Sequence, residues 1–215
     1  MKQKKHHEPS TGQGLGAPAQ REIRDKLQQV TVLLQAQRLA QADYLCQELL
    51  KKYPQAAQAW YFRGAIAHQA KKPTDAMAHL RQALALAPAQ APYWQALAAV
   101  QMAVGDGAGA VQSHTQAVEA NPQNSKAHFQ LAMALAAVGE GGLAVEAYGR
   151  VLALEPRHWT AAFNRGLLHQ KRNDNAAAVE DFTQVLQLRP SETSTYYSLG
   201  LSLRRLERYD EALDA

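Results

Sequence analysis

The sequence predicts an all-α fold in which pairs of helices repeat along the chain. Alanine dominates the apolar residues, which make up 47% of the 215 residues, and aromatic residues contribute only 7%. Runs of valine, isoleucine and threonine, which are typical of strands, are absent. Proline also returns every 34 residues, a period typical of stacked helix hairpins. The periodic prolines are Pro54, Pro88, Pro122, Pro156 and Pro190.

Each periodic proline is expected to end a helix. It follows a similar phrase in every repeat: LKKYP, LALAP, VEANP, LALEP and LQLRP. Proline lacks the amide hydrogen that a helix interior needs, and its ring pushes the preceding residue out of the α region. The phrases therefore predict that one helix of each 34-residue unit ends just before the proline.

Small residues also recur every 34 positions, at two places in the repeat that we call columns. Alanine lies twelve residues before each proline, and in every unit after the first, glycine or alanine lies another twelve residues earlier. Small residues that face each other let two antiparallel helices approach closely. The turn between these helices is indicated by GDG at 105–107, GEGG at 139–142 and NDN at 173–175. The columns are Ala42, Ala76, Ala110, Ala144, Ala178 and Ala212, and Gly64, Ala98, Ala132, Gly166 and Gly200.

The combined pattern resembles the tetratricopeptide repeat (TPR) family, most closely in WYFRGAIA at 60–67, YYSLGLSL at 196–203 and YDEALDA at 209–215. The resemblance implies a right-handed α-solenoid of five full hairpin units and a partial sixth. The first unit departs from the family pattern at Lys26, Gln29 and Val30, as expected of a terminal repeat with one face in water. The expected array covers 21–215, with units at 23–56, 57–90, 91–124, 125–158, 159–192 and 193–215.

Residues 1–20 are expected to form a flexible tail, which is basic and then rich in glycine and proline. This segment has no apolar core of the kind that a secretory signal needs, and no apolar run in the chain approaches the roughly 20 residues of a membrane span. The lone cysteine, Cys46, is expected to be buried and inert, and it leaves no internal disulfide. We therefore expect a cytoplasmic protein without a membrane span.

Composition also argues against several classes of function. The net charge of +4 divides into +7 for residues 1–90 and −3 for 91–215, but the basic residues are scattered, so no nucleic-acid partner is expected. No histidine pair has the spacing of zinc ligands, and GQGLG at 12–16 lacks the context of a phosphate loop. We expect no metal, no cofactor and no enzymatic activity. His114 and His128 occupy columns usually filled by aromatic residues and are interpreted as satisfied core residues.

In the TPR family, the first helices of successive hairpins line a concave groove, and the resemblance implies that a peptide or protein segment binds there. The usual groove positions are the fifth, ninth, twelfth and thirteenth of each unit. In this chain they predict a wall that is apolar in its middle and basic at its far end, suited to an amphipathic or extended apolar segment. The fifth-position aromatics have an alternative role in packing between repeats. The expected groove residues are Tyr61, His68, Gln69, Gln95, Met102, Phe129, Met133, Phe163, Leu167, Gln170, Lys171, Tyr197, Leu201, Arg204 and Arg205.

Two specialised binding modes of the family do not match this chain. The clamp for a C-terminal carboxylate needs lysine at the fifth position and asparagine or arginine at the ninth, where this chain has aromatic and apolar residues. An asparagine ladder at the sixth position would need more than the single Asn164.

Three functions remain open at this point. The first is a non-catalytic scaffold that binds a protein partner in the groove. The second is the N-terminal, substrate-presenting region of a larger glycosyl-, sulfo- or methyltransferase, which the truncated last unit favours. The third is a self-assembling scaffold, in which the uncapped C-terminal repeat forms a homo-oligomer.

Overall fold

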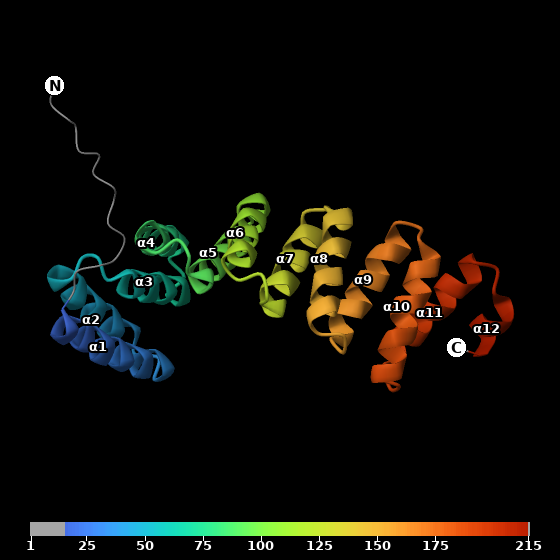
Figure 1. Ribbon diagram of the computed structural model, residues 1–215, viewed down its shortest axis with the longest axis horizontal. Helices are drawn as coiled ribbons and strands as arrows, with labels where there is room; N and C mark the ends of the chain where they lie inside the picture. Colours follow the sequence, from blue (N-terminus) through green and yellow to red (C-terminus); the bar gives the residue numbers. More distant parts are fainter. Residues whose placement is uncertain (1–15, 215) are drawn as a thin grey trace, which may run out of the picture. The chain divides into compact units, whose positions relative to one another are not determined.

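The computed structural model describes residues 16–214, and α-helices account for most of them (Figure 1). No strand occurs in this range, and the predicted all-α fold is confirmed. The chain divides into two compact units, up to Val100 and from Gln101 onward, so the division falls inside α5. The helices are α1 (Ala17–Gln35), α2 (Leu39–Lys52), α3 (Ala57–Gln69), α4 (Pro73–Leu86), α5 (Ala91–Ala103), α6 (Gly107–Ala120), α7 (Ser125–Ala137), α8 (Gly141–Leu154), α9 (Trp159–Lys171), α10 (Asn175–Leu188), α11 (Thr193–Arg205) and α12 (Tyr209–Asp214).

The helices pack as hairpins that stack within each unit. In the first unit α1 packs on α2 and α3 on α4, and in the second unit α7 packs on α8 and α9 on α10. Each hairpin also contacts the next, through α2 and α3 in the first unit and through α8 and α9, then α10 and α11, in the second. We call the odd-numbered helices the first helices of the hairpins and the even-numbered ones the second helices.

The second helix of a hairpin ends two residues before a periodic proline. In α4 the last residue is Leu86, and Ala87 adopts φ −145° and ψ 73°, outside the α region, directly before Pro88. The same geometry ends α2, α6, α8 and α10. The clash between proline and the residue before it explains these ends, as predicted from the sequence.

The turn inside each hairpin contains one residue in the left-handed region, with φ between 59° and 88°. After this residue, the chain donates a backbone hydrogen bond to a carbonyl five residues back, as from Asp106 to Gln101 at 2.8 Å. These bonds satisfy carbonyl groups at the end of the first helix. The left-handed residues recur every 34 positions: Gln37, Lys71, Gly105, Gly139, Asn173 and Glu207.

The predicted columns of small residues lie where the two helices of a hairpin approach most closely. A Cβ atom added to Gly64 would lie 2.6 Å from Cγ of Leu80 and 3.3 Å from the carbonyl oxygen of Ala76. A Cβ atom added to Gly166 would lie 2.8 Å from the ring of Phe182. The absence of a side chain at these positions therefore allows the partner helix to pack against the backbone.

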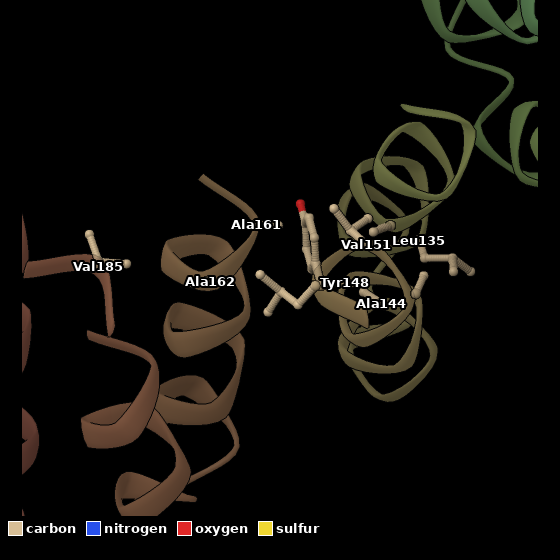
Figure 2. Packing of buried hydrophobic residues seen from close by; sticks show 10 residues of the cluster. Leu135, Ala144, Tyr148, Val151, Ala161, Ala162 and Val185 are labelled. Carbon is tan, nitrogen blue, oxygen red and sulfur yellow. The ribbon is translucent and has the colours of Figure 1, made fainter. Parts of the chain in front are cut away.

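Tyr148 marks the core of the second unit (Figure 2). Its ring extends from α8 toward α9, where Ala161 and Ala162 leave room for it, while Leu135 and Val151 pack on its other side. The side chain is only 2% exposed. This one large residue thus packs against three consecutive helices, α7, α8 and α9, with small residues on the side of α9.

The side chain at the fourth position of several units forms a hydrogen bond with the carbonyl oxygen of the preceding periodic proline. His128 Nε2 lies 2.9 Å from the carbonyl oxygen of Pro122. His128 is thus a half-buried hydrogen-bonding residue and not the core residue that its column predicts. The carbonyl groups accept the same kind of bond from Trp60 at Pro54 (3.0 Å), Trp94 at Pro88 (2.8 Å) and Tyr196 at Pro190 (3.1 Å).

The first helix begins at Ala17, so it includes the last four residues of the predicted tail. Pro18 favours this start because its φ suits the first turn and its missing amide hydrogen costs nothing there. The rest of the predicted tail and GQGLG at 12–16, apart from Gly16, lie outside the described residues. Between residues 16 and 214, none of the helices combines the length and apolar character needed to cross a bilayer.

Candidate functional site

A hollow of about 330 Å³ opens on the first helices of the second unit, and we call it the inner hollow. Its exposed rim is formed by Met133 of α7 and Leu167 of α9, whose side chains are 52% and 37% exposed. Large apolar side chains that remain this exposed beside a hollow are typical of a binding surface. The lining residues are Met133, Ala136, Tyr148, Asn164, Leu167, Leu168 and Lys171.

The floor of the inner hollow holds one polar pair. Asn164 Nδ2 of α9 donates a hydrogen bond to the Tyr148 hydroxyl of α8 over 3.2 Å. Burial raises the pKa of the Tyr148 phenol, while this bond from Asn164 opposes the rise. The hydroxyl therefore stays protonated at neutral pH.

A second hollow of about 510 Å³ adjoins the first, and we call it the outer hollow. The two share Ala136, Leu168 and Lys171 in their linings. The outer hollow also includes the turn Gly139–Gly142, the start of α8 and the end of α9. It carries both signs of charge, since Glu140 and Glu146 line it together with Lys171 and Arg172.

The fifth-position aromatics of the expected groove pack against other rings. Phe129 stacks on His158 with ring centroids 4.9 Å apart and meets the edge of Tyr148 at 5.6 Å. Phe163 lies 5.9 Å from Phe182. In the first unit, Tyr61 stacks on the Tyr93 ring at 4.8 Å. All three residues are half-buried. The Tyr61 contact joins two hairpins, whereas the Phe129–Tyr148 and Phe163–Phe182 contacts lie within one hairpin.

Expected groove residues at the C-terminal end gather at a third hollow of about 740 Å³, the terminal hollow. Tyr197, which is 77% exposed, lines it with Leu201 and Arg204 of the same helix, α11. Residues of α12, including Tyr209 and Leu213, form the opposite wall.

Gln170 and Arg205 link α9 to α11. Gln170 Nε2 donates to the carbonyl oxygen of Ser198 at 3.1 Å and to the Ser202 hydroxyl at 2.9 Å. Arg205 in turn donates to the carbonyl oxygen of Gln170 at 3.4 Å. The guanidinium of Arg205 is therefore placed beside the last turn of α9, next to Lys171.

The other expected groove residues lie away from these hollows. His68 is half-buried and Gln69 is exposed on α3. Gln95 Nε2 on α5 is buried without a hydrogen-bond partner in the described part of the chain. Met102 is exposed at the end of α5, beyond the division between the two units.

Of the residues that line the inner hollow, Ala136 occupies a twelfth position and belongs to the groove columns, whereas Tyr148, Asn164 and Leu168 lie outside them. Asn164 carried a signal, because it occupies the sixth position of its unit, but it was read only against a ladder of asparagines. Tyr148 belongs to a second helix and reaches the hollow from behind, which no column of first-helix positions predicts.

Cys46 has none of the properties of a nucleophile. Burial raises the pKa of its thiol to about 12, and the side chain is fully buried in α2. A thiolate is the reactive form of cysteine, so this group has little reactivity at neutral pH. Within residues 16–214, no three histidine, cysteine, aspartate or glutamate side chains cluster in a way that could hold a metal ion.

A protein-family model described as "Tetratricopeptide repeat" matches residues 27–91, 129–172 and 163–215, which together exceed half of the chain. Among curated proteins, none is similar enough to count as a match.

Several solved structures share the fold. The MamA protein is 20% identical with a TM-score of 0.68, over 74% of this chain and 86% of that one. YrrB, titled "a TPR protein with an unusual peptide-binding site", is 20% identical with a TM-score of 0.69, over 84% and 96% of the two chains. PilF of Pseudomonas aeruginosa is 17% identical with a TM-score of 0.71, over 92% and 90%. At these identities the likeness establishes the fold alone.

Proposed function

Because the chain belongs to the tetratricopeptide repeat family, we propose that it is a non-catalytic scaffold that binds a segment of a partner protein on the first helices of its second unit. The observation that carries this proposal is the inner hollow, where Met133 and Leu167 stay exposed around a floor formed by Tyr148 and Asn164. YrrB, which shares the fold, is described as "a TPR protein with an unusual peptide-binding site". This description supports a peptide-binding role for the present chain.

The chemistry of the inner hollow suits a polypeptide. An apolar side chain of the partner would cover Met133, Leu167 and Leu168, removing apolar surface from water on both sides. The Tyr148 hydroxyl and the Asn164 amide lie at the bottom, where they can hydrogen-bond a peptide group that follows the apolar side chain. Methionine at the rim adapts its shape to different side chains.

The test uses short random peptides displayed on phage and selected on the 215-residue chain. Peptides that bind the inner hollow should lose at least about tenfold in affinity for Met133→Glu or Leu167→Glu, because each change places an unpaired carboxylate against the apolar side chain of the peptide. Leu86→Glu is the matched control, since Leu86 is a similarly exposed apolar residue at the end of α4.

The proposed function fails if the selection yields no binding peptides. It also fails if the selected peptides bind Met133→Glu and Leu167→Glu with the same affinity as Leu86→Glu. Circular dichroism of all three variants should match that of the parent chain, because the substituted side chains are already exposed. A variant that loses helix content would be replaced by the corresponding change to glutamine.

A second candidate function is self-association through α12. This helix has six residues, none of them buried, and exposes Leu213 (86%) beside the terminal hollow. Contact with another copy would cover this apolar surface. Light scattering over a dilution series should then give a mass that falls on dilution and a constant monomer mass for Leu213→Glu. A monomer at every concentration of the parent chain would refute this function.

A further inference from the structure

We infer that the segment bound at the inner hollow is acidic, with carboxylate side chains close to its apolar anchor. This inference rests on the proposed function and adds the chemical class of the partner. Its starting point is the distribution of charge between the two kinds of helix. Among the first helices only α1 carries acidic residues, Glu22 and Asp25, whereas α3, α5, α7, α9 and α11 contain no aspartate or glutamate.

The second helices of the second unit have the opposite character. Their charged residues are acidic with the single exception of Arg150 on α8. The acidic residues are Glu119 on α6, Glu146 on α8, Glu180 and Asp181 on α10, and Asp210, Glu211 and Asp214 on α12. Residues 91–215 have a net charge of −3, but the charged residues on the first helices of this part are all positive.

Most cations of the first helices α7, α9 and α11, which belong to the second unit, are free to meet a partner. Arg165 of α9 is used inside the protein, where its guanidinium binds the buried carboxylate of Asp181 at 2.5 Å. The remaining cations form no ion pair with any residue between 16 and 214, and all of them are exposed. They are Lys126 on α7, Lys171 on α9, and Arg204 and Arg205 on α11.

Helix dipoles do not explain this distribution. They favour cations in the last turn of a helix, where Lys171, Arg204 and Arg205 lie, but they equally favour acidic residues in the first turn. The first turns of α7, α9 and α11 have no acidic residue. The missing carboxylates are accounted for by a negatively charged partner, which acidic side chains on these helices would repel.

One of these cations lines the inner hollow, and a second lies beside it. Lys171 lines it together with Met133 and Leu167, so a carboxylate that pairs with Lys171 follows the apolar anchor closely along the partner. Arg205 donates to the carbonyl oxygen of Gln170, which places a guanidinium beside the residue that precedes Lys171 and adds a second cation to its ammonium group. The acidic part of the segment therefore extends from the inner hollow toward α11. Glu140 and Glu146 line the outer hollow and not the inner hollow.

The peptides selected on the parent chain test this inference. Those whose binding is lost in Met133→Glu should be enriched in aspartate and glutamate near one large apolar residue, and their affinity should fall with added salt. The double variant Lys171→Glu, Arg204→Glu should weaken an acidic peptide at least about tenfold and should select basic peptides in a new round. Arg150→Glu, Arg157→Glu is the matched control, because these exposed arginines lie on α8 and in the loop after it.

Three outcomes would overturn the inference. Hollow-dependent peptides that are neutral or basic would refute it while leaving the proposed function intact. An equal loss in the two double variants would assign the effect to overall charge. A single-stranded RNA that displaces the acidic peptides and binds more tightly would show that the cations serve a nucleic acid. Loss of all hollow-dependent binding is the separate failure that refutes the proposed function itself.

Discussion

At the scale of single residues, His114 is the clearest case in which the repeat pattern and the chemistry of a side chain disagree. The equivalent positions in the other hairpins are Cys46, Leu80, Tyr148 and Phe182, all of them buried. His114 is buried as well, but its Nδ1 atom has no hydrogen-bond partner in the described part of the chain. A buried polar atom without a hydrogen-bond partner lowers stability. His114 is therefore a core residue as expected, but it is not the satisfied one that the sequence predicts.

We expect His114→Phe to raise the free energy of unfolding by about 1 kcal/mol, because it removes the unpaired polar atom and matches Phe182 of the equivalent position. Urea unfolding at pH 7.5 measures this change. A variant that is less stable than the parent would show that the site has no room for the larger ring.

The same residue predicts a dependence on pH. Burial lowers the pKa of His114 below its ordinary value of 6.5, so the unfolded chain takes up the proton first. The stabilisation is therefore complete above about pH 6.5 and is lost as the pH falls toward the folded-state pKa. Unfolding in urea at pH 7.5 and 5.5 should show a smaller loss for His114→Phe than for the parent. His79, whose pKa burial also lowers, accounts for loss that remains in the variant. Equal losses in the two proteins would contradict the assignment to His114.

Cys46 allows a second test at this scale. Because burial raises the pKa of its thiol to about 12, a disulfide reagent at pH 8 should label the folded chain only as fast as the first hairpin opens. The labelling rate in urea should then follow the unfolding of α2. Complete labelling within the mixing time in native buffer would mean that the thiol is accessible and that this packing is wrong.

At the scale of helices and hairpins, most of the fold could be predicted from the periodic small residues and prolines. They predicted where helices end and where two helices touch, because a missing side chain and a missing amide hydrogen act locally. The left-handed turn residues were only partly predictable. Gly105, Gly139 and Asn173 suggest such a turn, whereas Lys71 adopts it although its type does not favour it.

The close contact at Gly166 predicts a difference between two similar substitutions. Gly166→Ala should lower the free energy of unfolding by about 1–3 kcal/mol, because the added methyl group would lie 2.8 Å from the Phe182 ring. Gly200→Ala is the matched control in the same column, where the nearest atom is 3.7 Å away, and the preference of alanine for helix should make it neutral or stabilising. Thermal unfolding compares the two, and equal destabilisation would contradict the close approach at Gly166.

Hairpin packing also sets the limit of what could be predicted about the site. Ninth-position residues such as Met133 and Leu167 were expected on the binding surface from their column and lie at the rim of the inner hollow. The fifth position allows either a groove contact or packing inside the array, and the rings of Phe129 and Phe163 contact Tyr148 and Phe182 in the second helices of their own hairpins. Their column alone could not decide between these roles. The Tyr148–Asn164 bond joins two hairpins, so no local pattern predicts it.

At the scale of the whole molecule, the second unit combines the features that support binding. It holds the inner hollow, the first helices that lack acidic residues and the unpaired cations, and these properties do not depend on how the two units are placed. The expectation that the repeats precede a transferase domain stays a prediction that no described residue tests. A protein partner of acidic character would engage the same surface whether or not the chain continues into another domain.

The central claim, that a partner segment occupies the inner hollow, is tested most directly through the methionine methyl groups. The sequence has four methionines, of which Met133 lines the inner hollow, Met77 packs in the first unit and Met102 is exposed elsewhere. With methyl-labelled methionine, titration with a selected acidic peptide should shift the Met133 signal, assigned by Met133→Leu, and leave that of Met77 in place. A Met133 signal that does not move when the peptide is saturating would contradict the account.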